Sequence, residues 1–304
     1  MAGLQKEIWI EELKENFYSQ YGWLAKINDW SKYVENNTIN FAAVGTDPVV
    51  TKNSNATITS AQRTDTALAV TLDWYDTNTT HIFWTREEIE AAYDKLQSVI
   101  KQHKQKLMQE VVTEGLWNLA PATAAAGAVA VTGANRSVVI GSQSSVAATL
   151  TARDILGLKE RWDALDYPQE GRTMVLSPYH VTDLLSQDIS LAIKEKFGNL
   201  STGTPNNIYG FDMYVAANAP LYTKTTLAKK AYGAAADNTN DCVASVAFNV
   251  NEAVKAMGTV EVYYLERGMN PANRRDEIGF QIRAKVVPQR TTNFFQQALV
   301  SNRA

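Results

Sequence analysis

One long run of helical periodicity constrains this chain of 304 residues more than any other feature. From residue 85 to 111 the apolar side chains recur at steps of three or four residues or their multiples, so they share one helix face. Thr85 and Glu88 open the run with the spacing of a capping box, and Pro121 follows its expected end. Such a helix is roughly 40 Å long, well beyond the average in globular proteins. The fold must therefore be organised around a long strut.

Shorter elements of both kinds surround this helix. Alternating apolar and polar residues predict strands over 260–264 and 278–286, and the β-branched and aromatic run 68–84 also indicates strand. Further strands are expected over 173–176, 211–215 and 243–248. Helices are expected over 4–18, after the capping box of Thr151 and Asp154, after the Ser177–Pro178 cap, and over 250–257. Helices and strands in irregular order predict an α+β fold.

Three further stretches do not show the pattern of a helix or strand that would form a core of its own. Residues 45–66 are polar and turn-rich, so they cannot form a core of their own, but they can form a long β-hairpin ordered by a partner. The aromatics Tyr21, Trp23, Trp30 and Tyr33 have no clear period; they pack either on a neighbouring chain or on their own domain. Residues 120–149 are rich in small residues and are expected to form a linker with one strand at most; within them, 122–131 are expected to be a loop or a buried small-residue segment.

Charge and cysteine content exclude several protein classes. With 29 Lys and Arg against 32 Asp and Glu, the net charge of −3 argues against a dedicated nucleic-acid binder. Cys242 is the one cysteine, which excludes an intramolecular disulfide and a cysteine-based zinc site. No apolar run reaches the length of a membrane span, and the acidic, amphipathic N-terminal segment is not a secretory signal.

The residues that carry chemistry form no catalytic pattern. His81, His103 and His180 have no metal-binding spacing, and Ser177 is better explained as a helix cap than as a nucleophile. Asp73 and Asp76 are expected to lie in a turn. No nucleophile elbow or phosphate-binding glycine motif is present. We therefore expect no enzyme activity, no catalytic, cofactor or metal site, and no cofactor.

Several stretches in a fixed order resemble a known family. GLQKEIWIEELKENFY with YVENNTINFAAVGTDPVV, RTDTALAVTLDWYDTNTT, REEIEAAYDKLQSVI, RTMVLSPYHVTDLL, YGFDMYVAANAP and DEIGFQIRAKVVPQR resemble the major capsid proteins of tailed bacteriophages, which have the Hong Kong 97-type fold. Each motif consists of packing and turn residues, so their order along most of the chain is the specific signal.

The resemblance implies a division into functional parts. Residues 1–45 would be an N-terminal arm and 46–84 an extended β-hairpin loop. Residues 85–149 and 258–304 would form the peripheral domain, with the spine helix and return strands, and 150–257 the axial domain. Such chains form pentamers and hexamers that close into an icosahedral head shell around double-stranded DNA. The expected location is the virion capsid, assembled in the cytoplasm of the host bacterium, with no membrane partner.

The resemblance also suggests where subunits meet. The polar loop 266–277 is expected to be a peripheral loop with charged contacts between capsomers, and the extended loop reaches a neighbour. The candidate contact residues are Lys52, Arg63, Asp65, Arg267, Arg274, Arg275, Asp276 and Glu277. The further partners that the family suggests are portal and decoration proteins and a scaffolding protein, which would be a separate chain because the arm begins almost at Met1. Packaged DNA would be contacted without sequence specificity. Lys52 lies where some relatives form a covalent crosslink, but no matching motif accompanies it.

Three other interpretations stay open. An encapsulin-like bacterial compartment would use the same fold to enclose cargo protein. A soluble α+β hydrolase or binding protein would need a pocket with convergent polar groups, of which the sequence gives no trace. Another virion component, such as a tail or decoration protein, is the third.

Overall fold

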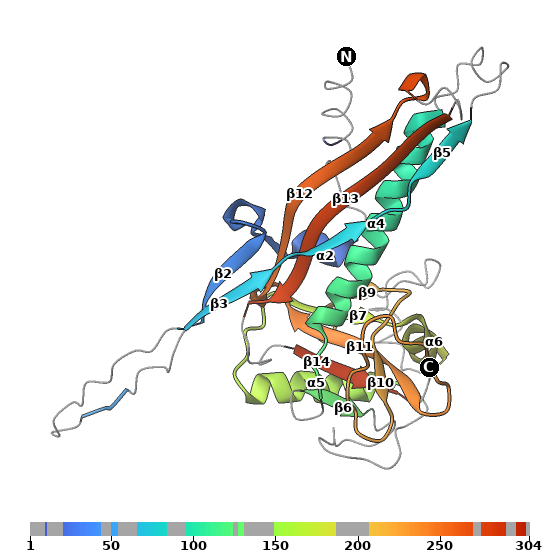
Figure 1. Ribbon diagram of the computed structural model, residues 1–304. Coiled ribbons are helices and arrows are strands. Elements are labelled where there is room, and N and C mark those ends of the chain that lie inside the picture. Colours follow the sequence, from blue (N-terminus) through green and yellow to red (C-terminus); the bar gives the residue numbers. More distant parts are fainter. Residues whose placement is uncertain are drawn as a thin grey trace.

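The computed structural model describes residues 10, 21–43, 50–53, 66–83, 95–123, 127–130, 149–186, 207–269, 275–289 and 296–301. Within these residues a long sheet runs along one helix, a more compact sheet lies at one end of that helix, and a separate two-stranded hairpin extends to one side (Figure 1). None of the helices in the described part is long and apolar enough to cross a membrane.

The long sheet is built around β12 (Ala253–Leu265) and β13 (Arg275–Pro288), which pair antiparallel. Along its other edge β13 pairs first with β5 (Thr80–Phe83) and then with β4 (Asp73–Asp76), while β1 (Asn28–Asp29) adds to β12. From Ile278 to Val286 the even-numbered side chains of β13 are buried. The alternation expected over 278–286 is confirmed, and it gives the sheet one face for packing.

Helix α4 (Lys95–Leu119) packs along this sheet (Figure 1). Its 25 residues make it roughly 38 Å long. The long strut is confirmed for the described part of the chain, whereas the capping box at Thr85 and Glu88 lies outside it. Gly115 permits a close approach, because a Cβ atom there would lie 3.0 Å from the Cβ and Cγ2 of Val286 in β13.

The compact sheet collects strands from distant parts of the sequence. Its order is β6 (Ala128–Ala130), β14 (Gln296–Val300), β11 (Asp241–Asn249), β7 (Arg172–Leu176), β9 (Phe211–Val215) and β8 (Asn207–Ile208), and β10 (Leu221–Thr223) also pairs with β11. Every residue of β7, β11 and β14 is buried. Strand β14 lies inside this sheet, between β6 and β11, so the described strands of the expected return segment 258–304 are divided between the two sheets.

Helices α5 (Ala152–Ala164) and α6 (Pro178–Ser186) belong to the compact part. The capping box of Thr151 and Asp154 is confirmed at the start of α5. Trp162 of α5 packs edge-on against Phe211, with ring centroids 5.2 Å apart. Leu165 ends the helix as its C-cap residue and is 52% exposed.

The first described segment packs on its own chain. Trp23 in α2 (Gly22–Lys26) is 1% exposed and meets Phe248 edge-on at 5.8 Å, and Trp30 stacks on Phe41 at 5.2 Å. Of the aromatic positions considered, these two therefore pack within the subunit, while Tyr33, in the 3-10 turn η1 (Ser31–Tyr33), is 65% exposed. The helix expected over 4–18 lies outside the described residues except Ile10, which is helical and packs against the main core.

A hairpin projects from the base of the long sheet. Strands β2 (Thr38–Ala43) and β3 (Thr66–Thr71) pair antiparallel over all six residues (Figure 1). Ile39 and Phe41 anchor it in a small core that also holds Leu72, Val254 and Ala256. The stem of the expected hairpin is thus present, and most of its distal residues lie outside the described part.

Two local expectations are wrong. Residues 250–257 form not a helix but a 3-10 turn, η3 (Val250–Glu252), and the start of β12, because Ala253–Met257 pair with β13. Asp73 and Asp76 lie in β4 and not in a turn. Within 122–131, residues 128–130 form β6, a strand that the expectation for 120–149 allowed, and its small residues pair in parallel with the buried β14.

Candidate inter-subunit surfaces

The histidines have structural partners instead of catalytic ones. His81 in β5 faces Glu277 of the neighbouring strand at 3.4 Å, and the Nε2 of His103 lies 2.8 Å from the hydroxyl of Thr80. Burial lowers the pKa of His103, which favours its neutral form. Among the described residues, no group of three acidic, histidine or cysteine side chains could hold a metal ion.

His180 is fully buried between two strands of the compact sheet. Its Nδ1 lies 2.6 Å from the hydroxyl of Ser245 in β11, and its Nε2 lies 2.5 Å from the hydroxyl of Ser301, just after β14. The Ser177 hydroxyl accepts the backbone N–H of His180, which confirms the expected helix cap. This Ser–His cluster has no access to solvent and locks α6 to the sheet.

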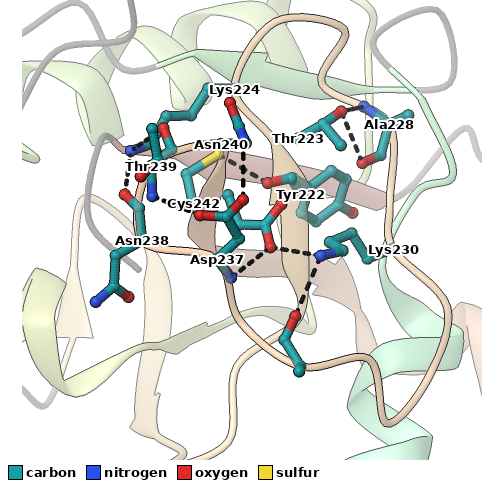
Figure 2. A network of polar contacts seen from close by, with 12 residues as sticks. Tyr222, Thr223, Lys224, Ala228, Lys230, Asp237, Asn238, Thr239, Asn240 and Cys242 are labelled. Atoms are coloured by element: carbon teal, nitrogen blue, oxygen red, sulfur yellow. Dashed lines mark hydrogen bonds and ion pairs between the residues drawn. The ribbon is translucent and has the colours of Figure 1, made fainter.

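The connection between β10 and β11 is a highly ordered exposed loop (Figure 2). Lys230 reaches across it to the carboxylate of Asp241 at 2.5 Å, and the same carboxylate accepts the backbone N–H of Asp237 at 2.8 Å. Asp237 in turn accepts from the backbone of Thr239 and the side chain of Asn240 (Figure 2). The Lys230 hydrogen bond is the main cause that lowers the pKa of Asp241, so this carboxylate stays charged.

The same loop is fixed to the end of α4. The Lys229 ammonium donates to the carbonyls of Trp117 and Ala120, at 2.9 and 2.8 Å, and lies 4.0 Å from the centroid of the Trp117 ring. Burial lowers the pKa of Lys229 to about 8. The Trp117 indole N–H donates back to the Lys230 carbonyl at 2.8 Å. Residues 235–240 thus form an exposed run on a rigid support, which suits a contact surface because little order is lost on binding. The sequence analysis did not identify this loop as a candidate surface. The turn-forming residues 237–241 were the sequence feature that could have indicated it.

The structure separates the predicted contact residues. Lys52 is exposed, whereas Arg63, Asp65 and Arg274 lie outside the described residues. Arg267 begins the 3-10 turn η4 (Arg267–Met269), and nothing is described of its side chain. The connection between β12 and β13 is shorter than the expected loop 266–277, since β13 already begins at Arg275.

Three of these charged residues are therefore strand residues. Arg275, Asp276 and Glu277 pair with Phe83, Ile82 and His81 of β5. The Nε of Arg275 donates to Glu277 at 2.8 Å within the strand, and Asp276 is 6% exposed. Asp276 is thus enclosed by its own subunit, while Arg275 and Glu277 are partly exposed beside the turn.

A second exposed face was not found from the sequence. Trp74 is 62% exposed on the face of the long sheet that carries Arg283, whose guanidinium lies 5.0 Å from the Trp74 ring. Tyr263, 54% exposed in β12, donates its hydroxyl to Glu261. Exposed Trp, Tyr and Arg side chains are enriched where proteins meet.

Comparison with known proteins shows which solved structures share this architecture. No protein-family model and no curated protein sequence matches the chain. Solved structures do match along most of its length. The mature capsid of bacteriophage PhiM1 is 15% identical with a TM-score of 0.58, covering 90% of this chain and 84% of that one. The capsid of Ralstonia phage GP4 is 10% identical with a TM-score of 0.59, covering 92% and 87%.

The same arrangement occurs in the capsid of an empty GTA particle, which is 11% identical with a TM-score of 0.59, covering 91% of this chain and 95% of that one. In each of these three structures the likeness extends over at least 90% of this chain. The chain has the Hong Kong 97-type α+β fold of tailed-phage major capsid proteins.

Proposed function

We propose that this chain is the major capsid protein of a tailed phage, a structural protein without enzyme activity that assembles into pentamers and hexamers of an icosahedral head. The observation that carries the proposal is the structural match to phage capsids, which covers 90% of the chain in one structure and 92% in another. Conserved fold alone does not dictate function. Here the described histidines contact side chains of their own subunit: His103 lies beside the Thr80 hydroxyl and His180 beside the Ser245 hydroxyl.

The geometry supports a shell-building role. Helix α4 and the long sheet form a rigid spine, which we assign to the peripheral domain, and the compact sheet forms the axial domain. The hairpin β2–β3 projects from the base of the spine and serves as the extended loop (Figure 1). Strand β14 belongs with the axial domain, because it pairs with β11. Residues 1–37 remain the proposed arm, anchored through Trp23, while residues 38–43, which the expected arm 1–45 included, form strand β2 of the hairpin.

The polar hairpin end supports contact with another subunit. Its stem is anchored by a small core, but the sequence 45–66 has few large apolar residues with which to order itself. A neighbouring subunit would supply the missing contacts, so that assembly and ordering occur together. The charged candidates other than the buried Asp276 would then meet neighbours at the hairpin and beside η4: Lys52, Arg63, Asp65, Arg267, Arg274, Arg275 and Glu277.

The partners follow from the same proposal. A separate scaffolding protein, a portal and decoration proteins would complete the head, and double-stranded DNA would be enclosed with non-specific contacts. The net charge of −3 fits an enclosing wall better than a tight DNA binder. Assembly would take place in the cytoplasm of the host bacterium.

Electron microscopy of the purified chain, together with its sedimentation profile, tests the proposal. Closed shells or capsomer-sized rings are expected, alone or on co-expression with the neighbouring head genes. Nucleic acid in shells isolated from phage-producing cells would support a phage head, and protein cargo without DNA would instead indicate a bacterial compartment. A compact monomer under all these conditions would overturn the shell role.

A further inference from the structure

A strap of residues 22–31 lies at the junction between the compact sheet and the long sheet (Figure 1). Its first half is α2, and this half contacts the compact sheet. Trp23 packs edge-on against Phe248 of β11, and the Lys26 ammonium lies 2.7 Å from the Asp212 carboxylate of β9. Because Trp23 is buried whereas the ion pair is exposed, apolar packing is the main attachment of α2 to this sheet.

The second half of the strap covers one edge of β12. There β1 pairs in parallel with β12, on the side opposite β13. Further along, the Trp30 backbone N–H donates to the Lys255 carbonyl at 2.9 Å, and the Ser31 hydroxyl accepts the Met257 N–H at 2.9 Å. An open strand edge is a template on which another chain can pair. The strap therefore satisfies backbone groups that would otherwise be available for such pairing.

One residue of β12 joins the two halves of the strap. The side chain of Lys255 is buried, and its Nζ donates to the α2 carbonyls of Leu24 at 2.8 Å and Ala25 at 3.4 Å. The main chain of Lys255 binds Trp30 at the same time. A buried ammonium is costly where an apolar side chain would pack, as it does at Val254 and Ala256 on either side. The directed contacts to α2 are what a lysine provides at this position.

We propose that the strap guards the edge of β12 against edge-to-edge pairing with a second copy of this chain, and that Lys255 is the positioning residue that keeps the strap closed. When the Lys255 contacts are lost, the strap opens locally while the cores of both sheets stay intact. The inference concerns the single subunit, so it goes beyond the capsid function and does not depend on it.

Hydrogen exchange of the full-length, unassembled chain, followed by mass spectrometry, tests the role of Lys255. Lys255→Met keeps the length of the side chain and removes the donor. Peptides of the strap and of residues 254–257 should exchange about tenfold faster or more, whereas peptides of β7 and β11 should keep their protection. Unchanged exchange in the strap would overturn the proposal. Equally faster exchange in β7 and β11 would overturn it too, because the loss would then be one of global stability.

Two further variants support the measurement. Lys26→Gln is the matched control, because it removes an exposed lysine contact of the same strap, and exchange there should stay within about twofold of the wild type. Ser31→Ala serves if Lys255→Met fails to fold. It removes the acceptor of the Met257 N–H, so exchange of this amide should rise while that of α2 does not. An unchanged Met257 amide would contradict the covered edge.

Sedimentation velocity tests the guarding role, under conditions in which the wild type stays unassembled. Lys255→Met should form larger species as its concentration rises, and Lys26→Gln should not. Adding Thr259→Lys, at an exposed position of β12, should suppress these species, since a charged side chain hinders edge pairing. A Lys255→Met chain that stays monomeric, or larger species that Thr259→Lys leaves unchanged, would overturn the guarding role. Shell formation by the wild type is a separate measurement, so either proposal can fail while the other stands.

Discussion

At the residue scale, buried polar groups are satisfied by partners that lie both near them in the sequence and far from them. Arg172 is 3% exposed, and its guanidinium reaches Asp163 at 2.7 Å and the carbonyls of Tyr167 and Pro168. His180 depends on Ser301, which lies 121 residues further along the chain. A buried polar group without its partners costs stability, so these contacts restrict which residues the positions tolerate.

We expect His180→Phe to lower the free energy of unfolding by about 1–3 kcal/mol, because the hydroxyls of Ser245 and Ser301 lose their ring partner in a site closed to water. Urea denaturation followed by circular dichroism measures this change. Tyr179→Phe, at the half-exposed neighbouring position, should leave the midpoint nearly unchanged. Equal stability of the two variants would show that the Ser–His cluster contributes nothing.

At the element scale, the distance between α4 and the long sheet is set by a residue without a side chain. Gly115 faces Val286 so closely that a methyl group added at Gly115 would push the Val286 side chain away. Glycine costs a helix about 1 kcal/mol relative to alanine, so the sequence accepts a local penalty for a close contact. At this position, helix α4 therefore has a residue that favours close packing on the sheet over helix propensity.

We expect Gly115→Ala to be destabilising, since overpacking of about 1–3 kcal/mol outweighs the gain in helix propensity. Calorimetry should show a lower Tm, and Val286→Ala in the same chain should recover part of the loss by making room for the methyl group. Gly268→Ala is the control, because a Cβ atom at Gly268 meets nothing within 4 Å. A Tm for Gly115→Ala above that of the wild type would contradict the prediction, because it would show that Val286 moves aside at little cost.

At the scale of the whole molecule, the subunit combines a self-sufficient body with parts suited to meeting other subunits. One core cluster runs through both sheets and α4, whereas a separate small cluster anchors the hairpin. Folding of the body and engagement of the hairpin are therefore separable, and a variant can lose one without the other.

Replacing residues 44–65 by an Asn-Gly turn should leave the subunit folded, because the six-residue pairing of β2 and β3 is compatible with a two-residue hairpin turn. Under the capsid proposal this variant should no longer form shells. Electron microscopy and the far-ultraviolet circular dichroism spectrum report the two properties. Shells of normal size from the shortened chain would show that the end of the hairpin makes no contact that assembly requires.

Charge reversal tests the contacts proposed beside η4. Arg274→Glu with Arg275→Glu should impair shell assembly while changing subunit stability by less than about 1 kcal/mol, since exposed ion pairs contribute little. Arg275→Gln alone is the matched control, because it removes the ion pair with Glu277 inside β13 without introducing a negative charge. Unaltered assembly of the double variant, measured by sedimentation, would exclude these arginines from the capsomer contacts.

Local patterns in the sequence determined the elements that need no distant partner. The alternation of β13, the apolar stripe of α4, the capping box of α5 and the cap at Ser177 follow from neighbours two to four residues apart. The order of weak motifs also pointed to the capsid fold. For the candidate surfaces, the sequence indicated the polar hairpin and the charged run near residue 275, but not which of its charges are buried.

Tertiary structure decided the rest, because these features depend on contacts between residues far apart in the chain. Ala253–Met257 are strand since β13 pairs with them, and 128–130 are strand since β14 does. The β10–β11 loop is held by its own Lys229, which donates to carbonyls at the end of α4, more than 100 residues away in the sequence. The contacts of Glu114 with Tyr75 and of Glu110 with Tyr232 form only when α4 meets β4 and the β10–β11 loop. Propensity acts over a few residues, whereas burial and pairing act through space, and where the two disagree the larger free energy of packing prevails.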